Sequence, residues 1–235
     1  MGGILCSGSS PTTETTTMVS SEKPVLVYWG VHGRSDFCQA MMAAGNIDYD
    51  LDTETGNAWP AAKEESPFGQ IPYLKHGALT LGQGGALNRY CARIAGLYPS
   101  DAVEASICDM YMEEMMDIFS GLFPPNGAAD KEAKITAWKF VQDSHLPKHY
   151  ALLEKNLVKS GKPFLGGDKP NAADVAFFAV NNVYSKASID TDKVLSDVAP
   201  TLQKALSETT KLGQLSNFAP DRGLYFSSDP ENASF

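Results

Sequence analysis

The sequence predicts an α/β domain followed by an all-α domain, and three observations carry this prediction. A continuously apolar, β-prone run at 25–29 precedes a helical pattern and a second short strand at 47–51. A β-hairpin pattern at 68–81 then precedes another helix, which ends at Gly96. Every later segment with a clear period repeats its apolar residues at helical spacing.

The first domain begins with the strand Val25–Trp29, which lacks alternation, as expected for a strand buried on both faces. The following helix carries an apolar stripe over 37–44 and ends at Gly45. Because the two flanking strands form a βαβ unit, they should be parallel. A turn at 76–77 joins the hairpin strands, and the last helix of the domain begins near Gln83. This order of elements is the thioredoxin-like arrangement.

The second domain is predicted from helical patterns alone. They cover residues 107–122, 128–157, 171–187 and 194–211. The second pattern forms one helix or two, with Pro147 as the expected bend. The third is apolar almost all round and should be the central helix of the domain. Asn171 and Asp174 at its start resemble a capping box.

These patterns divide the chain into a disordered tail at 1–22, a thioredoxin-like domain at 23–97, a helical domain at 98–220 and an irregular tail at 221–235. The first tail is rich in Ser, Thr and Gly and shows no period. Its start, Met1–Ser7, partly fits N-myristoylation, and Cys6 could carry palmitate, although an unmodified tail also fits. One acyl chain gives only marginal membrane binding, so anchoring would require both.

The composition excludes several function classes. The formal net charge of −9 argues against a nucleic-acid partner, which needs a basic face, but leaves room for a local basic pocket. The four cysteines form no CxxC pair and have no zinc-ligand spacing, so we expect no metal. Cys38, Cys91 and Cys108 are read as small buried apolar residues, and reduced thiols fit a cytoplasmic protein. No secretory signal and no bilayer-spanning run is evident.

Several separate segments together resemble the glutathione S-transferases, and the sigma class most closely. They are Leu26–Arg34, Trp59–Lys63, Pro67–Pro72, Leu79–Gln83, Asn88–Tyr90 and Gly166–Asp174. Each is weak alone, but they occur in the family's order and spacing, from roughly Pro24 to Gly213. The resemblance implies a two-domain, tyrosine-using enzyme that binds glutathione as co-substrate and attacks small hydrophobic electrophiles with its thiolate.

Tyr28 is the catalytic residue that the resemblance implies. The thiol of glutathione has a pKa of about 8.5, and a hydroxyl that donates to the sulfur favours the thiolate. Lowering that pKa by two units requires about 2.7 kcal/mol, of which one charge-assisted hydrogen bond supplies roughly half or more. Arg34 matches an arginine that supports this hydroxyl in the family. Taken singly, Tyr28 would fit a buried strand tyrosine and Arg34 a surface charge.

The resemblance also implies how glutathione is held. Ile71, before a cis Pro72, should pair with the cysteinyl backbone as an added strand would. The γ-glutamyl carboxylate should lie at the helix start near Gln83, where N–H groups favour an anion. A serine usually follows this glutamine in the family, and Gly84 stands in its place. The backbone N–H remains but the hydroxyl is missing, so weaker glutathione binding is expected.

Four more residues complete the implied site. Trp59 and Lys63 match residues at the glycyl end of glutathione, and Gln70 is a hydrogen-bond donor beside them. Asp117 matches an acid that reaches the glutathione of the partner subunit, which implies a homodimer. Lys63 and Asp117 would equally fit solvated charges. Met110, Met115, Met116 and Phe119 could line the electrophile pocket or belong to the core or a dimer contact.

Three other functions share this fold. A thiol transferase of the omega type needs a cysteine at the first strand-to-helix junction, and residues 29–35 contain none. A prostaglandin-type isomerase would use the same glutathione site with a different electrophile pocket. A crystallin-like or ligand-storage protein would bind without turnover, an alternative that Gly84 keeps open.

Overall fold

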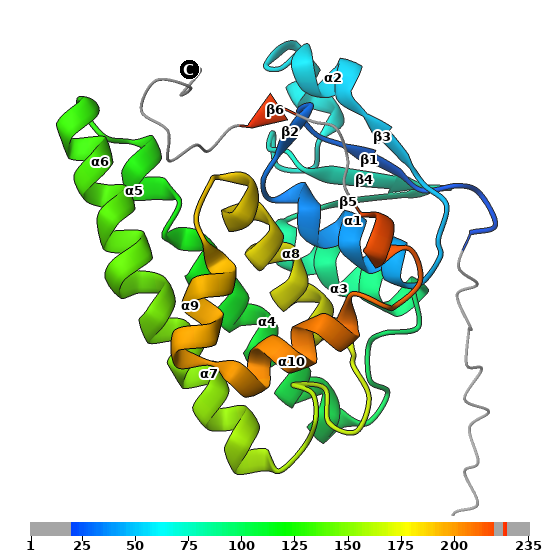
Figure 1. Ribbon diagram of the computed structural model, residues 1–235. Helices are drawn as coiled ribbons and strands as arrows, with labels where there is room; N and C mark the ends of the chain where they lie inside the picture. The colour runs from blue at the N-terminus through cyan, green and yellow to red at the C-terminus, as the bar shows by residue number, and fades with distance from the viewer. Residues whose placement is uncertain (1–19, 219–222, 225–235) are drawn as a thin grey trace, which may run out of the picture.

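A four-stranded mixed sheet organises the first part of the chain in the computed structural model, which describes residues 20–218 and 223–224 (Figure 1). The strands are β1 (Val25–Val27), β3 (Asp50–Asp52), β4 (Tyr73–His76) and β5 (Leu79–Gly82). They lie in the order β3-β1-β4-β5, with β3 parallel to β1 and the other neighbours antiparallel. Leu26 and Val27 are fully buried, which confirms the predicted central strand.

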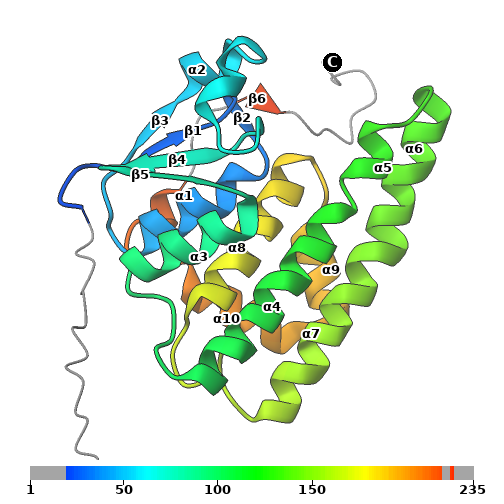
Figure 2. The same ribbon diagram turned by 180° about the vertical axis from the view of Figure 1, so that it is seen from behind.

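Helices cover both faces of this sheet. Figures 1 and 2 show α1 (Ser35–Ala44) and α3 (Gly84–Ile94) together on the face toward the helical part, with α2 (Thr53–Asn57) on the other side. A 3-10 turn, Ala61–Glu65, follows α2 and leads toward β4. The predicted βαβ unit and hairpin are therefore present, as the thioredoxin-like arrangement requires.

The second part of the chain is helical. Its helices are α4 (Ala102–Ser120), α5 (Phe123–Asn126), α6 (Lys131–Phe140), α7 (Leu146–Ser160), α8 (Ala172–Lys186), α9 (Thr191–Val198) and α10 (Pro200–Thr209), followed by a 3-10 turn at Leu215–Asn217. α8 packs against α1 on one side and α4 on the other, so it is the predicted central helix. The capping box of Asn171 and Asp174 is also confirmed. No helix among residues 20–218 is long and apolar enough to cross a membrane.

Two strand boundaries differ from those expected. β1 ends at Val27, and the second strand begins at Asp50. Ile47 and Tyr49 still pack against the core, from the segment before that strand.

The helical pattern at 128–157 forms two α-helices, α6 and α7, joined by a π-helical segment, Val141–His145. Pro147, the expected bend, lies in the first turn of α7, directly after this segment.

The end of the chain returns to the sheet domain. β6 (Gly223–Leu224) pairs in parallel with β2 (Val31–His32), in the loop between β1 and α1. The sequence predicts an irregular tail there, because two residues are too few to show a period. The other residues of that tail lie outside the described residues. Residues 1–19, which include the possible lipidation sites Gly2 and Cys6, also lie outside them.

Candidate functional site

A pocket of about 410 Å³ lies where four loops of the sheet domain meet. Its lining residues are Trp29, Arg34, Trp59, Lys63, Gly69, Gln70, Ile71, Pro72, Gln83 and Gly84. The structure thus brings together most of the residues singled out from the sequence, although they come from segments up to 55 positions apart (Trp29 to Gly84). Trp29 and Gly69 were missed. Each adjoins a residue that was singled out, Tyr28 and Gln70, and only the folded loops show that they face the same space.

The charge of this pocket is opposite in sign to that of the whole chain. Arg34 and Lys63 are the charged side chains that line it, and no carboxylate does so among the described residues. The formal net charge of the protein is −9. Local cations raise the concentration of an anionic ligand in a cleft even on an acidic protein. The pocket is therefore suited to a small anion.

The start of α3 supplies backbone donors to the same pocket. Gln83 precedes the helix with φ of 68°, and Gly84 is the first helical residue. The first N–H groups of a helix lack partners within the helix and favour an anion. The Gln83 amide Nε2 donates to Gln70 Oε1 at 3.2 Å, which joins two sides of the pocket. The Ile71–Pro72 peptide bond is cis, as expected.

The side chain of Tyr28 is buried next to this pocket and contacts two of its lining residues, Trp29 and Arg34. Tyr28 is 5% exposed and is not one of the lining residues. Its ring lies 5.4 Å, centroid to centroid, from that of Trp29, which does line the pocket. The hydroxyl oxygen accepts a hydrogen bond from the backbone N–H of Arg34 at 3.3 Å. The structure thus places the phenol next to two lining residues.

Arg34 contacts the Tyr28 hydroxyl through its backbone N–H, and its guanidinium group lies over two aromatic rings. The guanidinium carbon lies 5.6 Å from the centroid of the Phe119 ring and 5.3 Å from that of Phe123, in cation–π geometry. Arg34 also begins α1 as its N-cap residue. The guanidinium group of Arg34 therefore forms part of the pocket wall, while its backbone N–H donates to the Tyr28 hydroxyl.

Comparisons with known proteins identify the family. The family described as glutathione S-transferase, C-terminal domain, matches residues 115–221. A glutathione S-transferase P of Caenorhabditis elegans is 30% identical over 155 residues, covering 65% of this chain and 73% of that protein. The chain belongs to the glutathione S-transferase family. A hematopoietic prostaglandin D synthase of Gallus gallus is 33% identical over 144 residues, covering 61% of this chain and 67% of that protein.

The fold agrees with this family assignment. The solved glutathione S-transferase of Ascaris lumbricoides matches with a TM-score of 0.70 at 22% identity, covering 86% of this chain and 98% of that one. The predicted fold class, a thioredoxin-like domain followed by an all-α domain, is therefore confirmed.

The three cysteines in the described part of this glutathione S-transferase chain are core residues. Cys38, Cys91 and Cys108 are free thiols and at most 1% exposed, as expected for small core residues. Cys38 Sγ donates to Asn88 Oδ1 at 3.2 Å. A hydrogen bond with Cys91, together with burial, raises the pKa of the Cys38 thiol well above its usual range. This thiol is therefore unsuited to the nucleophilic role of the omega type.

Asp117 lies away from the pocket. It is exposed on α4 and does not line the pocket of its own chain. The nearby apolar residues divide between two environments. Met115 and Phe119 are buried in the core, whereas Met110 is 56% exposed. Core packing therefore accounts for Met115 and Phe119, while Met110 is left on the surface.

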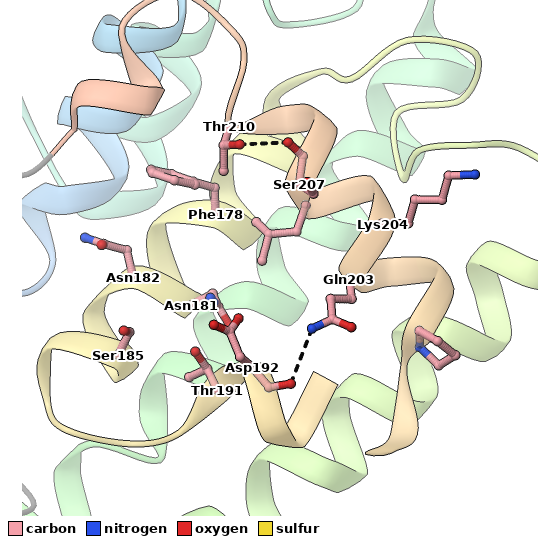
Figure 3. A pocket seen from close by; sticks show the side chains of 12 residues that line it. Phe178, Asn181, Asn182, Ser185, Thr191, Asp192, Gln203, Lys204, Ser207 and Thr210 are labelled. Atoms are coloured by element: carbon pink, nitrogen blue, oxygen red, sulfur yellow. Dashed lines mark hydrogen bonds between the residues drawn. The ribbon is translucent and has the colours of Figure 1, made fainter. Parts of the chain in front are cut away.

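A larger pocket, of about 750 Å³, lies in the helical part of the molecule (Figure 3). Side chains of α8 and of the start of α9, such as Asn181 and Asp192, line it together with Gln203 and Ser207 of α10. The amide Nε2 of Gln203 donates to the backbone oxygen of Asp192 at 3.4 Å. This pocket carries one lysine, Lys204, and one carboxylate, Asp192. Its charges are balanced, unlike those of the pocket beside Tyr28.

Within the described part of the chain, no group of three or more His, Cys, Asp or Glu side chains is placed to hold a metal ion.

Proposed function

We propose that this chain is a glutathione transferase that binds glutathione in the pocket beside Tyr28 and uses the Tyr28 hydroxyl to stabilise the thiolate. The observation that carries the proposal is one pocket with two cations, a helix start and an adjoining phenol. Glutathione carries two carboxylates and one ammonium group at neutral pH, so it needs such a pocket. The named relatives support transferase activity.

The pocket offers each part of glutathione a matching group. The γ-glutamyl carboxylate fits the N–H groups at the start of α3, beside Gln83 and Gly84. The glycyl carboxylate fits Lys63, with Trp59 and Gln70 beside it. The cysteinyl backbone fits against Ile71, before the cis proline Pro72. This placement directs the sulfur toward Tyr28.

The chemistry then requires little beyond a thiolate. The glutathione thiol loses its proton to solvent, and the Tyr28 O–H donates a hydrogen bond to the sulfur anion. The sulfur electron pair forms a bond to an electrophilic carbon. In a substitution the leaving group departs with its electron pair, and in an addition the product carbanion takes a proton from water. The Tyr28 side chain remains protonated throughout.

Within the family we infer a sigma-like enzyme, and a prostaglandin-type isomerase is the second candidate. The resemblance of segments such as Leu26–Arg34 supports the class. The similarity to the chicken prostaglandin D synthase supports the isomerase. Both activities use the same thiolate, so they differ in the electrophile that fits. A crystallin-like binding protein is the outcome in which glutathione binds without turnover.

A homodimer is also proposed, with α4 at its interface. Val103, Ile107 and Met110 are 67%, 45% and 56% exposed, and their spacing places them on one stripe of this helix. Asp117 continues that spacing by a further seven residues (117 minus 110). An exposed apolar stripe of this kind is typical of an interface between proteins. A cytoplasmic location remains a prediction.

The substitution Tyr28→Phe tests the proposed function, because it removes only the hydroxyl. The thiolate absorbance of bound glutathione, followed against pH, should show a midpoint about one to two units higher than in the wild type. Conjugation of a chlorinated nitrobenzene should slow in parallel, while glutathione affinity stays the same. An unchanged midpoint with unchanged turnover would remove Tyr28 from the mechanism. Conversion of a prostaglandin endoperoxide, measured beside the nitrobenzene assay, separates isomerase from general transferase.

A further inference from the structure

A fully buried carboxylate lies close to the Tyr28 hydroxyl, and the catalytic proposal does not use it. Asp36 is the second residue of α1 and is 0% exposed. Burial of a carboxylate is costly unless hydrogen bonds compensate it. Asp36 Oδ2 accepts from the backbone N–H of Gly33 at 2.7 Å, and Oδ1 pairs with His32 Nδ1 at 2.7 Å. An ionised carboxylate only accepts, so Nδ1 carries the proton in that contact.

Both donors belong to the loop that contacts Tyr28. The N–H of Arg34 donates to Tyr28 Oη at 3.3 Å. At the preceding residue, Gly33, a Cβ atom would lie 2.7 Å from the same oxygen. The hydroxyl is therefore in contact with two consecutive loop residues, Gly33 and Arg34. The backbone N–H of Gly33 also donates a hydrogen bond to Asp36.

The contact with Arg34 determines which way the hydroxyl can donate. A phenol has one proton to donate and can also accept. The N–H of Arg34 cannot accept a hydrogen bond, so the Tyr28 proton must point elsewhere. Accepting a hydrogen bond also polarises the O–H group and strengthens it as a donor. A loop that holds the Arg34 N–H in place thus both orients and strengthens the bond to a thiolate.

We propose that Asp36 is a positioning residue for Tyr28: by holding His32 and the Gly33 N–H, it fixes the loop whose next N–H, that of Arg34, orients the catalytic hydroxyl. This inference rests on the proposed function and deepens it. The loop is also paired on its other side, through β2, with the C-terminal strand β6. Asp36 fixes the end of the loop that contacts the hydroxyl.

The test is Asp36→Asn in the full chain, with thiolate absorbance of bound glutathione measured against pH. The midpoint should rise by about half to one pH unit, and turnover at a pH below the midpoint should fall about threefold to tenfold. The KM for glutathione should stay close to that of the wild type, because no pocket-lining residue changes. The direction of the midpoint shift distinguishes positioning from a simple charge effect. Loss of a nearby negative charge alone would favour the thiolate and lower the midpoint.

A double variant separates this inference from the proposed function. In a Tyr28→Phe background, Asp36→Asn should cause no further shift, because no hydroxyl remains to be oriented. If Tyr28→Phe raises the midpoint and Asp36→Asn leaves it unchanged or lowers it, the positioning role is wrong and the proposed function stands. An equal rise in both backgrounds would also overturn the positioning role. If Tyr28→Phe alone has no effect, the proposed function fails.

Two further variants protect the test against misfolding and against simple charge effects. Gly33→Ala keeps Asp36 but places a Cβ against Tyr28 Oη, so the midpoint should again rise, and an unchanged midpoint would contradict the role of the loop. Asp52→Asn is the matched charge control, because Asp52 caps α2 by accepting from the Thr55 N–H at 2.9 Å. Asn caps a helix as well as Asp does. Asp52→Asn should not raise the midpoint, and a rise equal to that of Asp36→Asn would overturn the proposal.

Discussion

Asp36 at the start of α1 and Asp174 at the start of α8 are similar in local chemistry but differ in what their loops contact. Each is buried in the first turn of its helix and accepts hydrogen bonds from the loop before it. The loop of Asp36 reaches the Tyr28 hydroxyl. Asp174 accepts from the N–H groups of Leu165, Gly166 and Asn171 at 2.8, 2.9 and 3.0 Å, and all three are backbone groups.

A buried carboxylate that holds the loop before its helix therefore has different consequences in the two parts of the molecule. In the sheet domain, the loop held by Asp36 contacts the hydroxyl next to the pocket. In the helical part, the loop held by Asp174 precedes the buried helix α8. We therefore expect changes near the sheet pocket to alter affinity and thiolate chemistry, and changes near α8 to alter stability.

The largest effect is expected for Asp174→Ala. Burial raises the pKa of Asp174, against the influence of its three N–H donors, and removing the carboxylate leaves those donors without their acceptor. Loss of a cap and of buried hydrogen bonds should reduce the free energy of unfolding by about 3 kcal/mol or more. Thermal unfolding should show a melting temperature roughly 6–12 °C lower.

Asp168→Ala is the control for that variant. Asp168 lies in the same loop but is 77% exposed and pairs only with Lys162 among its ionic contacts in the described residues. Exposed ion pairs contribute about 0–1 kcal/mol, so its melting temperature should change little. If Asp174→Ala weakens glutathione binding in the folded protein, the separation between the two parts breaks down.

The next effect is expected for Gly84→Ser. A Cβ at Gly84 would meet no atom within 4 Å, so the hydroxyl has room beside the start of α3. A hydrogen bond to a charged group contributes about 1.5–3 kcal/mol, and displaced water should reduce the gain to the smaller end. Glutathione should therefore bind roughly tenfold more tightly, as measured by isothermal titration. No gain in affinity would mean that the γ-glutamyl carboxylate lies elsewhere or is already satisfied.

A smaller loss of affinity is expected for Lys63→Gln. Lys63 is exposed at the pocket, so solvent should weaken its proposed pairing with the glycyl carboxylate. The dissociation constant for glutathione should rise about threefold to fivefold, and less at high salt. Lys204→Gln removes the same charge from the larger pocket between α8 and α10 and should have no effect. Equal losses for the two variants would show only a general effect of net charge.

The smallest effect concerns the stability of the helical part in acid. Burial lowers the pKa of His145, and nearby His149 and Lys148 act in the same direction, against the Ile118 carbonyl and Glu114. The unfolded chain therefore binds a proton more readily than the folded chain, and stability should fall as pH drops below about 6.5. His145→Gln keeps a donor for the Ile118 carbonyl, which His145 Nε2 contacts at 2.9 Å, but cannot be protonated. The difference in melting temperature between pH 7 and pH 5 should shrink in this variant, whereas an unchanged difference would exclude His145 as a cause.

The order of the elements and the chemistry of their side chains can be read from the amino-acid sequence alone. The apolar run at 25–29, the helical stripe after it and the hairpin at 76–77 are local patterns, and local sterics and burial make them readable without a structure. The capping box at Asn171 and Asp174 is readable for the same reason, since both partners lie within one turn. Boundaries were less certain, as the late start of β3 shows.

Which groups lie close together depends on the tertiary fold. Trp29 and Gly84 line one pocket because the sheet brings distant loops together, and no periodicity encodes that distance. The support of the Tyr28 hydroxyl by a backbone N–H was likewise invisible, because every residue but proline carries that group. The pairing of β6 with β2 joins residues 192 positions apart (223 minus 31), and two-residue strands leave no pattern in a sequence. Contacts also depend on which side chains the whole fold buries, so the hydrogen bond from the Gly33 N–H to a fully buried Asp36 became visible only in the structure.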